Sequence, residues 1–316
     1  MTRLPHDRSD LLWEGGDSGS PTAMFADSID RWVDAMVGDE QGGGSSAEHD
    51  ITAVVIAKQS GIMSGQCAVE RLIQRHFQDC LLSWSIKESE IVKEGGEVLV
   101  VRGPASEVLR CERIMLNLLG RMSGIATNTA DWVAGSESME VACTRKTEWG
   151  LLDKWAVHTG GGLTHRLSRA DALMIKENDL PALAPGVDDE ITAVSQVVAE
   201  IDMDKFAAFT VIEVRDSKQA LAAARAWAKV QIKRDGCEKI VLLLDNMGPD
   251  GCTEAHSQLM TEELREWCIL EGSGGVKLTQ LDKWVTSGVD LVSTSALNRG
   301  VAPLDLSMRV RNERHG

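Results

Sequence analysis

The second half of the chain alternates short apolar runs with stretches of helical periodicity. After Gly135, runs typical of buried strands recur, and helical patterns at 217–230 and 278–287 separate some of them. This alternation predicts parallel strands joined by crossover helices, either in an open doubly wound sheet or in a barrel. The runs assigned to strands are 140–144, 172–176, 208–214, 239–245, 267–271 and 291–296.

Polar residues at the ends of these runs favour the barrel. In a parallel barrel the carboxyl ends of all strands face one mouth, so side chains at those positions converge there. A dinucleotide-binding sheet is expected to carry a G-x-G-x-x-G turn after an early strand, and the sequence has none. The predicted fold class is therefore α/β with a β/α barrel. The run ends carry Arg145, Lys146, Lys176, Glu213, Asp245, Glu271 and Ser293 to Ser295.

The first part of the chain has a mixed pattern, with fewer and more widely spaced strand-like runs. Its long amphipathic stretch ends near residue 132, and Gly124 predicts a break in it, with a domain junction nearby. The predicted elements are helices 24–36, 67–80 and 106–132, strands 51–57 and 97–101, and Gly/Ser-rich loops 15–20 and 42–46.

Charge and cysteine usage narrow the class of protein. The 316 residues carry 48 acidic against 33 basic side chains, a formal net charge of -15, which argues against nucleic-acid or anionic-membrane partners. The seven cysteines form no C-x-x-C pair, so we expect buried free thiols in a reducing cytosol rather than a zinc or disulfide framework. No apolar run is long enough to span a bilayer and no signal peptide is visible, so a cytoplasmic location is expected.

Basic residues gather between positions 145 and 176 of this acidic chain. A pocket with several guanidinium and ammonium groups suits a ligand that carries more than one carboxylate or phosphate. Solvated helix faces account adequately for Lys154 and Arg169, and His158 fits either interpretation. The residues that we expect at the barrel mouth are Arg145, Lys146, His165, Arg166 and Lys176.

Two further features point to a phosphorylated sugar. The segment E-G-S-G-G at 271–275 follows an apolar run, and its small residues let backbone N–H groups approach an anion. The hydroxyls of 293–295 lie at the next strand end, and two such loops on late barrel strands form a recurrent phosphate site. Glu213 and Asp245 lie at the ends of apolar runs, where a buried carboxylate needs a partner. One interpretation is an ion pair with a barrel lysine, and the other is that the acids hold sugar hydroxyls or a magnesium-bound phosphate. The two interpretations are compatible.

Several segments, in this order, resemble the quinolinate phosphoribosyltransferases, also called carboxylating nicotinate-nucleotide pyrophosphorylases. The resemblance extends from about residue 51 to 310. The matching segments are E-R-I-M-L-N-L-L-G-R-M-S-G-I-A-T (112–127), T-R-K-T (144–147), L-D-K-W-A-V-H-T-G-G-G-L-T-H-R-L (152–167), I-K-E-N (175–178), V-I-E-V (211–214), L-L-D-N-M (243–247), E-G-S-G-G-V (271–276) and A-P-L-D-L-S (302–307).

The resemblance implies a two-domain enzyme. An N-terminal α/β sandwich, residues 1–120 with the C-terminal segment 302–316, would accompany a partly open β/α barrel at 121–301. Members of the family are at least dimers, so Arg113 is expected to enter the site of the neighbouring subunit. Quinolinate and phosphoribosyl pyrophosphate are the implied substrates, with Mg2+ as cofactor, in a pentosyltransferase of de novo NAD biosynthesis.

The resemblance also assigns roles to individual residues. It implies that the carboxylates of quinolinate and the phosphates of the co-substrate are bound by Arg145, Lys146, His165, Arg166 and Lys176. It implies that the 5′-phosphate is bound by Ser273, Gly274 and Ser295. Lys146 and the acids beside the ribose, Glu213 and Asp245, are the candidate catalytic residues.

The sequence departs from the family pattern at Val211, Asp179, Ser295 and Arg299, where an acid, a histidine, a glycine and a histidine are usual. These departures leave two alternatives open. One is a related phosphoribosyltransferase for nicotinate or for the ligand of the molybdenum-cluster paralogues. The other is a non-catalytic barrel that binds phosphorylated metabolites.

Overall fold

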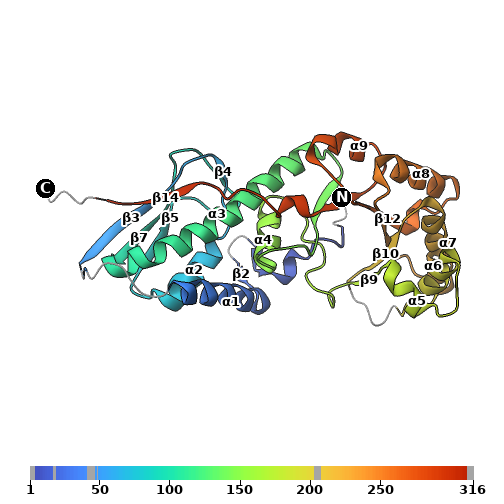
Figure 1. Cartoon of the computed structure of the whole chain (residues 1–316), viewed down its shortest axis with the longest axis horizontal. Helices are drawn as coiled ribbons and strands as arrows, with labels where there is room; N and C mark the ends of the chain where they lie inside the picture. The colour runs from blue at the N-terminus through green and yellow to red at the C-terminus, as the bar shows by residue number, and fades with distance from the viewer. Residues whose placement is uncertain (1–3, 17–18, 41–46, 48, 203–207, 312–316) are drawn as a thin grey trace. The chain divides into compact units, whose positions relative to one another are not determined.

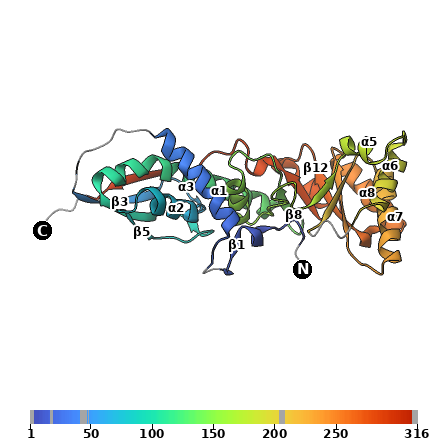
Figure 2. The same cartoon turned by 90° about the horizontal axis from the view of Figure 1, so that it is seen from below.

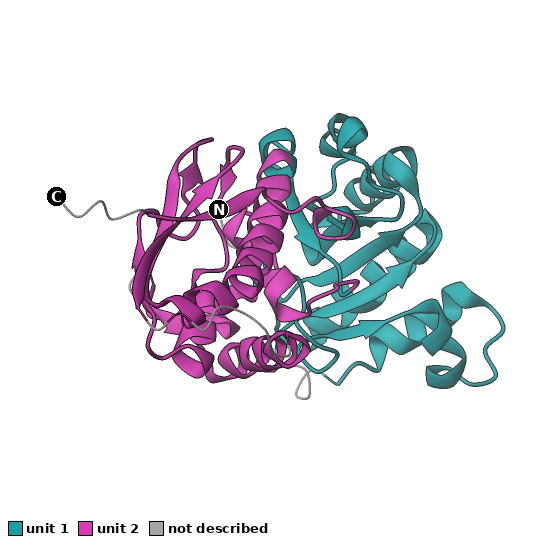
Figure 3. Cartoon of the chain, turned by 60° about the vertical axis from the view of Figure 1, so that its left-hand side comes forward, with its two compact units in different colours: residues 1–7, 132–145, 165–296 teal, residues 8–131, 146–164, 297–316 magenta. Residues whose placement is uncertain are grey.

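The computed structural model describes residues 4–16, 19–40, 47, 49–202 and 208–311. Two compact units divide the chain, and they are coloured separately in Figure 3. Unit 1 comprises Met1–Asp7, Trp132–Arg145 and His165–Ala296, and unit 2 comprises Arg8–Asp131, Lys146–Thr164 and Leu297–Gly316. The predicted loop at 42–46 lies outside the described residues.

Unit 1 is built around a six-stranded parallel sheet with the order β8-β13-β12-β11-β10-β9. Strands that follow one another from β9 to β13 are neighbours, and β13 returns to pair with β8, so β8 and β9 lie at the two edges. This arrangement is a partly open barrel, and the predicted fold class is confirmed (Figure 1). The strands are β8 Glu140–Cys143, β9 Leu173–Ile175, β10 Thr210–Val214, β11 Ile240–Asp245, β12 Cys268–Ser273 and β13 Leu291–Thr294.

Helices cover the outer face of this sheet (Figure 1). A side chain at Gly272 of β12 would collide with Trp284 of α9, because a Cβ there would lie 2.5 Å from the indole. Side chains alternate between the faces of a strand, so Glu271 and Ser273 point away from α9, into the barrel. The helices are α5 Leu180–Leu183, α6 Glu190–Ala199, α7 Ser217–Lys233, α8 Gly248–Thr261 and α9 Leu281–Val285.

Unit 2 contains a four-stranded antiparallel sheet with the order β14-β3-β7-β5. Figures 1 and 2 show α2 and α3 beside its strands. The C-terminal strand β14 joins this sheet by pairing with β3, so the last described residues belong to the same layer as residues near the start. The strands are β3 Asp50–Ala57, β5 Leu81–Trp84, β7 Glu97–Pro104 and β14 Leu306–Val310; the short pairs are β1 Trp13–Glu14 with β2 Ser20–Pro21 and β4 Gly61–Ile62 with β6 Ile91–Val92.

The helices of unit 2 follow the apolar periodicity of the sequence. Thr22 caps α1, since its side chain accepts a hydrogen bond from the backbone N–H of Phe25, and Phe25 is buried. The prediction of a helix end at residue 80 was wrong by four positions, because α2 ends at His76 and Phe77 turns into the core. The helices are α1 Ala23–Asp39, α2 Gln66–His76, α3 Ala105–Gly135 and α4 Leu151–Thr159.

The predicted break at Gly124 is wrong, because α3 runs without interruption through this residue. A Cβ at Gly124 would lie 2.3 Å from the carbonyl oxygen of Ala302 and 2.9 Å from Cα of Pro303. The glycine therefore serves the close approach of the segment before β14, and not a helix end.

The compact units differ from the predicted domains in four segments, namely 1–7, 121–131, 146–164 and 297–301. The division falls after Asp131 rather than after residue 120, and the segment Lys146–Thr164, which includes α4, belongs to unit 2. Cys237 also departs from the expectation of buried thiols, because it is exposed, whereas the other cysteines are buried. Within the described residues, no helix is long and apolar enough to cross a membrane.

Candidate functional site

The interior face of the unit 1 sheet gathers the polar residues predicted at its strand ends. Glu213 of β10 is in register with Leu243 of β11, which is in register with Glu271 of β12. One layer higher, Asp245 pairs in register with Ser273. Neighbouring residues in register point to the same side of a sheet, so these acids and the hydroxyl share the barrel interior.

Arg166 supplies a largely buried positive charge to this interior. The residue is 8% exposed, and its guanidinium donates to the carbonyl oxygen of Ala172 at 3.3 Å and to Sδ of Met174 at 3.2 Å. Burial, and then the charges of Arg145 and Arg169, lower the pKa of this guanidinium. Among the described side chains, no carboxylate lies within ion-pair distance of it. A buried cation of this kind is stabilised by binding an anion.

His165 precedes Arg166 in a strained backbone conformation, with φ of 52°. Its Nδ1 accepts a hydrogen bond from the backbone N–H of Arg166 at 2.7 Å, and its Nε2 lies 3.1 Å from Oε1 of Glu271. Because Nδ1 is an acceptor, the proton of the neutral ring is on Nε2, which donates to the carboxylate. The sequence therefore places His165 correctly in the cluster, with Glu271 as its hydrogen-bond partner.

Lys176 and Glu213 form an ion pair where β9 and β10 end. The lysine is half exposed and the glutamate is buried, so the pair lies at the boundary between interior and solvent. The expectation that a barrel lysine neutralises Glu213 is confirmed for Lys176. Asp179 stands where the family usually has histidine, and its carboxylate accepts from the backbone N–H of Lys176 at 2.8 Å. It therefore holds the turn that carries Lys176.

In the loop after β12, Gly274 leaves room for the side chain of Asn246 in the loop after β11. A Cβ at Gly274, where φ is 90°, would lie 2.2 Å from Oδ1 of Asn246, so only glycine fits. Asn246 in turn donates from Nδ2 to Asp245 at 2.6 Å, and its backbone N–H donates to the carbonyl oxygen of Ser273 at 2.9 Å. These contacts join the predicted phosphate loop to the predicted ribose acid.

Ser295 begins a short 3-10 helix directly after β13, and it is partly exposed. The backbone N–H of Ala296 donates to Oγ1 of Thr294 at 3.1 Å. The loop therefore has hydroxyl groups at its start, as predicted, and the side chain of Ser295 is accommodated without displacing β13.

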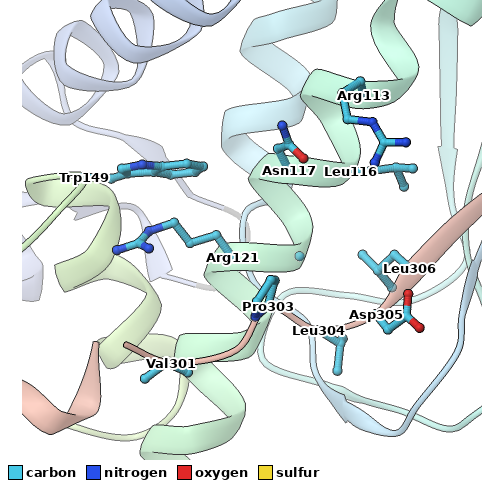
Figure 4. A pocket seen from close by; sticks show the side chains of 11 residues that line it. Arg113, Leu116, Asn117, Arg121, Trp149, Val301, Pro303, Leu304, Asp305 and Leu306 are labelled. Carbon is cyan, nitrogen blue, oxygen red and sulfur yellow. The ribbon is translucent and has the colours of Figure 1, made fainter. Parts of the chain in front are cut away.

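Two predicted site residues belong to unit 2. Lys146 is exposed, and its carbonyl oxygen accepts from Nδ2 of Asn298 at 3.0 Å. Arg113 is an exposed residue of α3 and lines a cavity of about 500 Å³ on unit 2 (Figure 4). Its guanidinium lies beside Leu116, at the other end of the cavity from Trp149. The residues that the structure brings together in unit 1 are Arg145, His165, Arg166, Lys176, Glu213, Asp245, Ser273, Gly274 and Ser295.

The two arginines of this cavity differ in their partners. Arg121 donates twice to the buried carboxylate of Asp153, at 3.0 and 2.9 Å, and stacks 4.9 Å from the ring of Trp149. Within the described residues, Arg113 has no ion pair. Arg121 is thus a structural residue, whereas the charge of Arg113 stays available to an external anion.

Lys154 contradicts the expectation of a solvated cation. It is 2% exposed, and Nζ donates to the carbonyl oxygen of Thr164 at 2.6 Å. Arg169 is exposed, as expected, and the ring of His158 packs 5.2 Å from that of Trp155. The departure at Val211 is a fully buried valine in β10, in register with Val241, which leaves Glu213 as the acid of that strand's interior face.

Sequence reasoning missed the contribution of the N-terminal segment. His6 is fully buried in unit 1, and its Nε2 lies 3.1 Å from Oε2 of Glu271. The two residues are separated by 265 positions, so no local pattern could have indicated the contact.

Comparison with known proteins covers both parts of the chain. The family described as quinolinate phosphoribosyl transferase, C-terminal domain, matches residues 125–309, and the corresponding N-terminal domain family matches 40–123. A probable carboxylating nicotinate-nucleotide pyrophosphorylase of Methanothermobacter thermautotrophicus is 32% identical over 267 residues, covering 83% of this chain and 88% of the relative. A protein of the same description from Archaeoglobus fulgidus is 31% identical over 267 residues, covering 83% and 95%.

A comparison with solved structures finds similarity to proteins of the same description. The nicotinate-nucleotide pyrophosphorylase of Francisella tularensis superimposes with a TM-score of 0.76 at 25% identity, covering 90% of this chain and 97% of that chain. The similarity therefore includes the barrel and the preceding domain together.

Proposed function

The chain belongs to the quinolinate phosphoribosyltransferase family, and we propose that it transfers phosphoribose from phosphoribosyl pyrophosphate to the nitrogen of quinolinate. The products are nicotinate mononucleotide, pyrophosphate and carbon dioxide. The enzyme is a pentosyltransferase of NAD biosynthesis, and we propose that it works in the cytosol.

The observation that carries this proposal is the buried guanidinium of Arg166 beside Arg145 and Arg169. Mutual repulsion and burial both disfavour this arrangement, as the lowered pKa of Arg166 indicates. A ligand with two carboxylates removes both penalties, because each carboxylate accepts paired hydrogen bonds from a guanidinium. A monocarboxylate such as nicotinate neutralises only one of these charges, so the cluster favours quinolinate over nicotinate.

The acids on the interior face suit the chemistry at the sugar. As the bond from C1 of ribose to pyrophosphate breaks, its electron pair leaves with pyrophosphate, and positive charge grows at C1. Glu213 and Asp245 are placed to stabilise this charge electrostatically, while the cations hold the pyridine ring so that its nitrogen lone pair forms the new bond.

Decarboxylation then needs no nucleophilic side chain. The ribosylated nitrogen is positive, so it stabilises the electron pair that remains on ring C2 when the bond to the 2-carboxylate breaks. Carbon dioxide leaves, and C2 takes a proton from water. Lys146, which follows Arg145, is proposed to contact the reacting groups.

Magnesium is proposed to enter with the pyrophosphate group and to neutralise its charge as it leaves. The carboxylates of Glu213 and Asp245 are hard oxygen donors that fit such an ion. Chelation by EDTA should abolish product formation, and added Mg2+ should restore it; full activity in EDTA would remove Mg2+ from the proposal.

A homodimer is proposed as the active form, with Arg113 entering the neighbouring subunit's site. Its support is the difference between the arginines on unit 2: Arg121 is fully paired, whereas Arg113 is exposed and without an ion pair among the described residues. Mixing Arg113→Ala with Lys146→Ala protein should restore activity to mixed dimers, because one of their two sites is intact. Mixed dimers that stay inactive would refute a shared site.

The proposed substrate is tested with purified protein, Mg2+ and phosphoribosyl pyrophosphate, supplied with either quinolinate or nicotinate. Product from quinolinate is expected; product from nicotinate alone would refute the proposal and favour the related transferase. Arg166→Ala should raise KM for quinolinate by on the order of 10²-fold and KM for the donor far less, since a charge-assisted bidentate contact is lost. Arg225→Ala, at an exposed position of α7, is the matched control.

A further inference from the structure

Two histidines share one buried carboxylate inside unit 1. The exposed fraction is 0% for His6, 4% for His165 and 0% for Glu271. His6 lies 3.1 Å from Oε2 of Glu271, and His165 lies 3.1 Å from Oε1. The imidazole rings meet edge to face, with centroids 4.9 Å apart, and Phe209 packs against both.

The N-terminal segment that supplies His6 lies outside the stretch that the family domains match, which starts at residue 40. The described part of this segment begins at Leu4, and His6 belongs to unit 1 together with the barrel strands. His165 and Glu271, by contrast, lie within the matched region 125–309. The cluster therefore joins a residue from outside the matched stretches to two residues within them.

The hydrogen-bond pattern determines what the cluster can do. Nδ1 of His165 accepts the backbone N–H of Arg166, so the proton of the neutral ring must be on Nε2, facing Glu271. A metal ion in this position would require the lone pair of Nε2, which this tautomer does not offer. The geometry thus favours an ionised carboxylate held between two N–H donors.

Glu271 has to stay ionised for this arrangement to persist. Burial alone would raise its pKa, but the interactions with His165 and then with His6 outweigh burial and hold the pKa well below its usual range. If His6 is removed, a fully buried carboxylate loses one of its two imidazole donors and Oε2 keeps only the contact with Nε2 of His165 at 3.2 Å, which destabilises the ionised form. A protonated Glu271 binds the Nε2–H of His165 less strongly, so the ring, whose backbone is already strained at φ of 52°, keeps only its contact with the backbone N–H of Arg166 as a firm anchor.

We propose that His6 is a positioning residue for quinolinate binding: through Glu271 it fixes the orientation of the His165 ring, and with it the adjoining Arg166. The proposal rests on the proposed function. His6 is joined through the side chain of Glu271 to His165 on the ring-binding side of the site, whereas the donor's 5′-phosphate is assigned to Ser273, Gly274 and Ser295. Its effect therefore falls on quinolinate more than on the phosphoribosyl donor.

Steady-state kinetics of His6→Ala provide the first test. We expect KM for quinolinate to rise about tenfold or more, which is the size of effect expected when a hydrogen bond to a charged group is lost. We expect KM for phosphoribosyl pyrophosphate to change little. His6→Gln, which keeps a side-chain N–H donor, should recover most of the loss. His49→Ala, at an exposed histidine of unit 2, should behave as wild type.

A purely structural role gives a different result, namely a lower melting temperature with both KM values unchanged in the folded fraction. That result in His6→Ala would overturn the proposal. If His6→Ala does not fold, His6→Leu, which fills the space without an N–H donor, is measured in its place and decides the question by the same ratio of the two KM values. Wild-type protein that forms no product from quinolinate would overturn the proposed function instead.

Histidine nitrogen NMR tests the coupling without turnover. In ¹⁵N-histidine protein we expect one neutral Nε2–H ring that disappears in His165→Gln, which assigns it to His165. In His6→Ala the Nε2 signal of this ring should shift, because the carboxylate that accepts its proton has lost the contact with His6. An unchanged His165 signal would overturn the inference whatever the activity of the protein.

Discussion

Gly274 and Gly275 are adjacent in the loop after β12, but a methyl group meets different surroundings at each. At Gly275 φ is 64°, and nothing lies within 4 Å of the added Cβ. At Gly274 φ is 90°, outside the small left-handed region that alanine tolerates, and the Cβ would lie 2.2 Å from Oδ1 and 2.9 Å from Cα of Asn246. Because Cα of Asn246 is a backbone atom, the loop after β11 must move to relieve this contact.

The magnitudes follow from these contacts. A left-handed alanine costs roughly 1–2 kcal/mol at either position. Overpacking against Asn246 adds about 1–3 kcal/mol at Gly274 alone. Since Asn246 donates to Asp245 at 2.6 Å, its displacement also moves the proposed ribose acid. A shift of this kind lowers the catalytic rate on the order of 10²-fold.

Urea unfolding of the ligand-free protein and steady-state kinetics measure the two effects. Gly274→Ala should be less stable than Gly275→Ala by about 1–3 kcal/mol and should lose far more kcat/KM for the phosphoribosyl donor. Equal stabilities of the two variants, or a larger stability loss in Gly275→Ala, would refute the argument from the close approach of Asn246.

Two other predictions concern stability. Arg121→Met should reduce the free energy of unfolding by about 3–5 kcal/mol, because it leaves the carboxylate of Asp153 buried without its cation. Arg110→Met on the same helix should reduce it by under about 1 kcal/mol, because the ion pair of Arg110 is exposed. Similar losses for the two variants in urea titrations would contradict this reasoning. Burial, and then Arg265, lower the pKa of His256, so the unfolded chain binds its proton more tightly. This contribution is present above about pH 6.5 and is lost as the pH falls through the lowered pKa. His256→Gln should therefore weaken the decline in stability between about pH 7.5 and about pH 5, and an unchanged decline would refute the assignment.

Much of the barrel could be predicted because its strands are buried on both faces. Parallel strands under helices appear as continuous apolar runs, so β11, expected at 239–245, is observed at Ile240–Asp245. The polar residues at the ends of these runs indicated the interior cluster for the same reason. The convergence of strand ends at one mouth also predicted that Glu213 could pair with a barrel lysine, and the structure shows that this lysine is Lys176.

The errors arose where distant contacts override local pattern. Gly124 suggested a helix end, but the approach of Ala302 explains the glycine. Lys154 was expected on a solvated helix face, yet it is buried and its Nζ donates a hydrogen bond to the carbonyl oxygen of Thr164. His6 carries no local signal, because its partner Glu271 is supplied by a strand near the other end of the chain.

Carbon dioxide release tests the central claim most directly. Protein incubated with Mg2+, phosphoribosyl pyrophosphate and quinolinate labelled with ¹³C in the 2-carboxylate should release labelled carbon dioxide, pyrophosphate and unlabelled nicotinate mononucleotide in equal amounts. Failure to release the label, or formation of the nucleotide from nicotinate but not from quinolinate, would contradict the account.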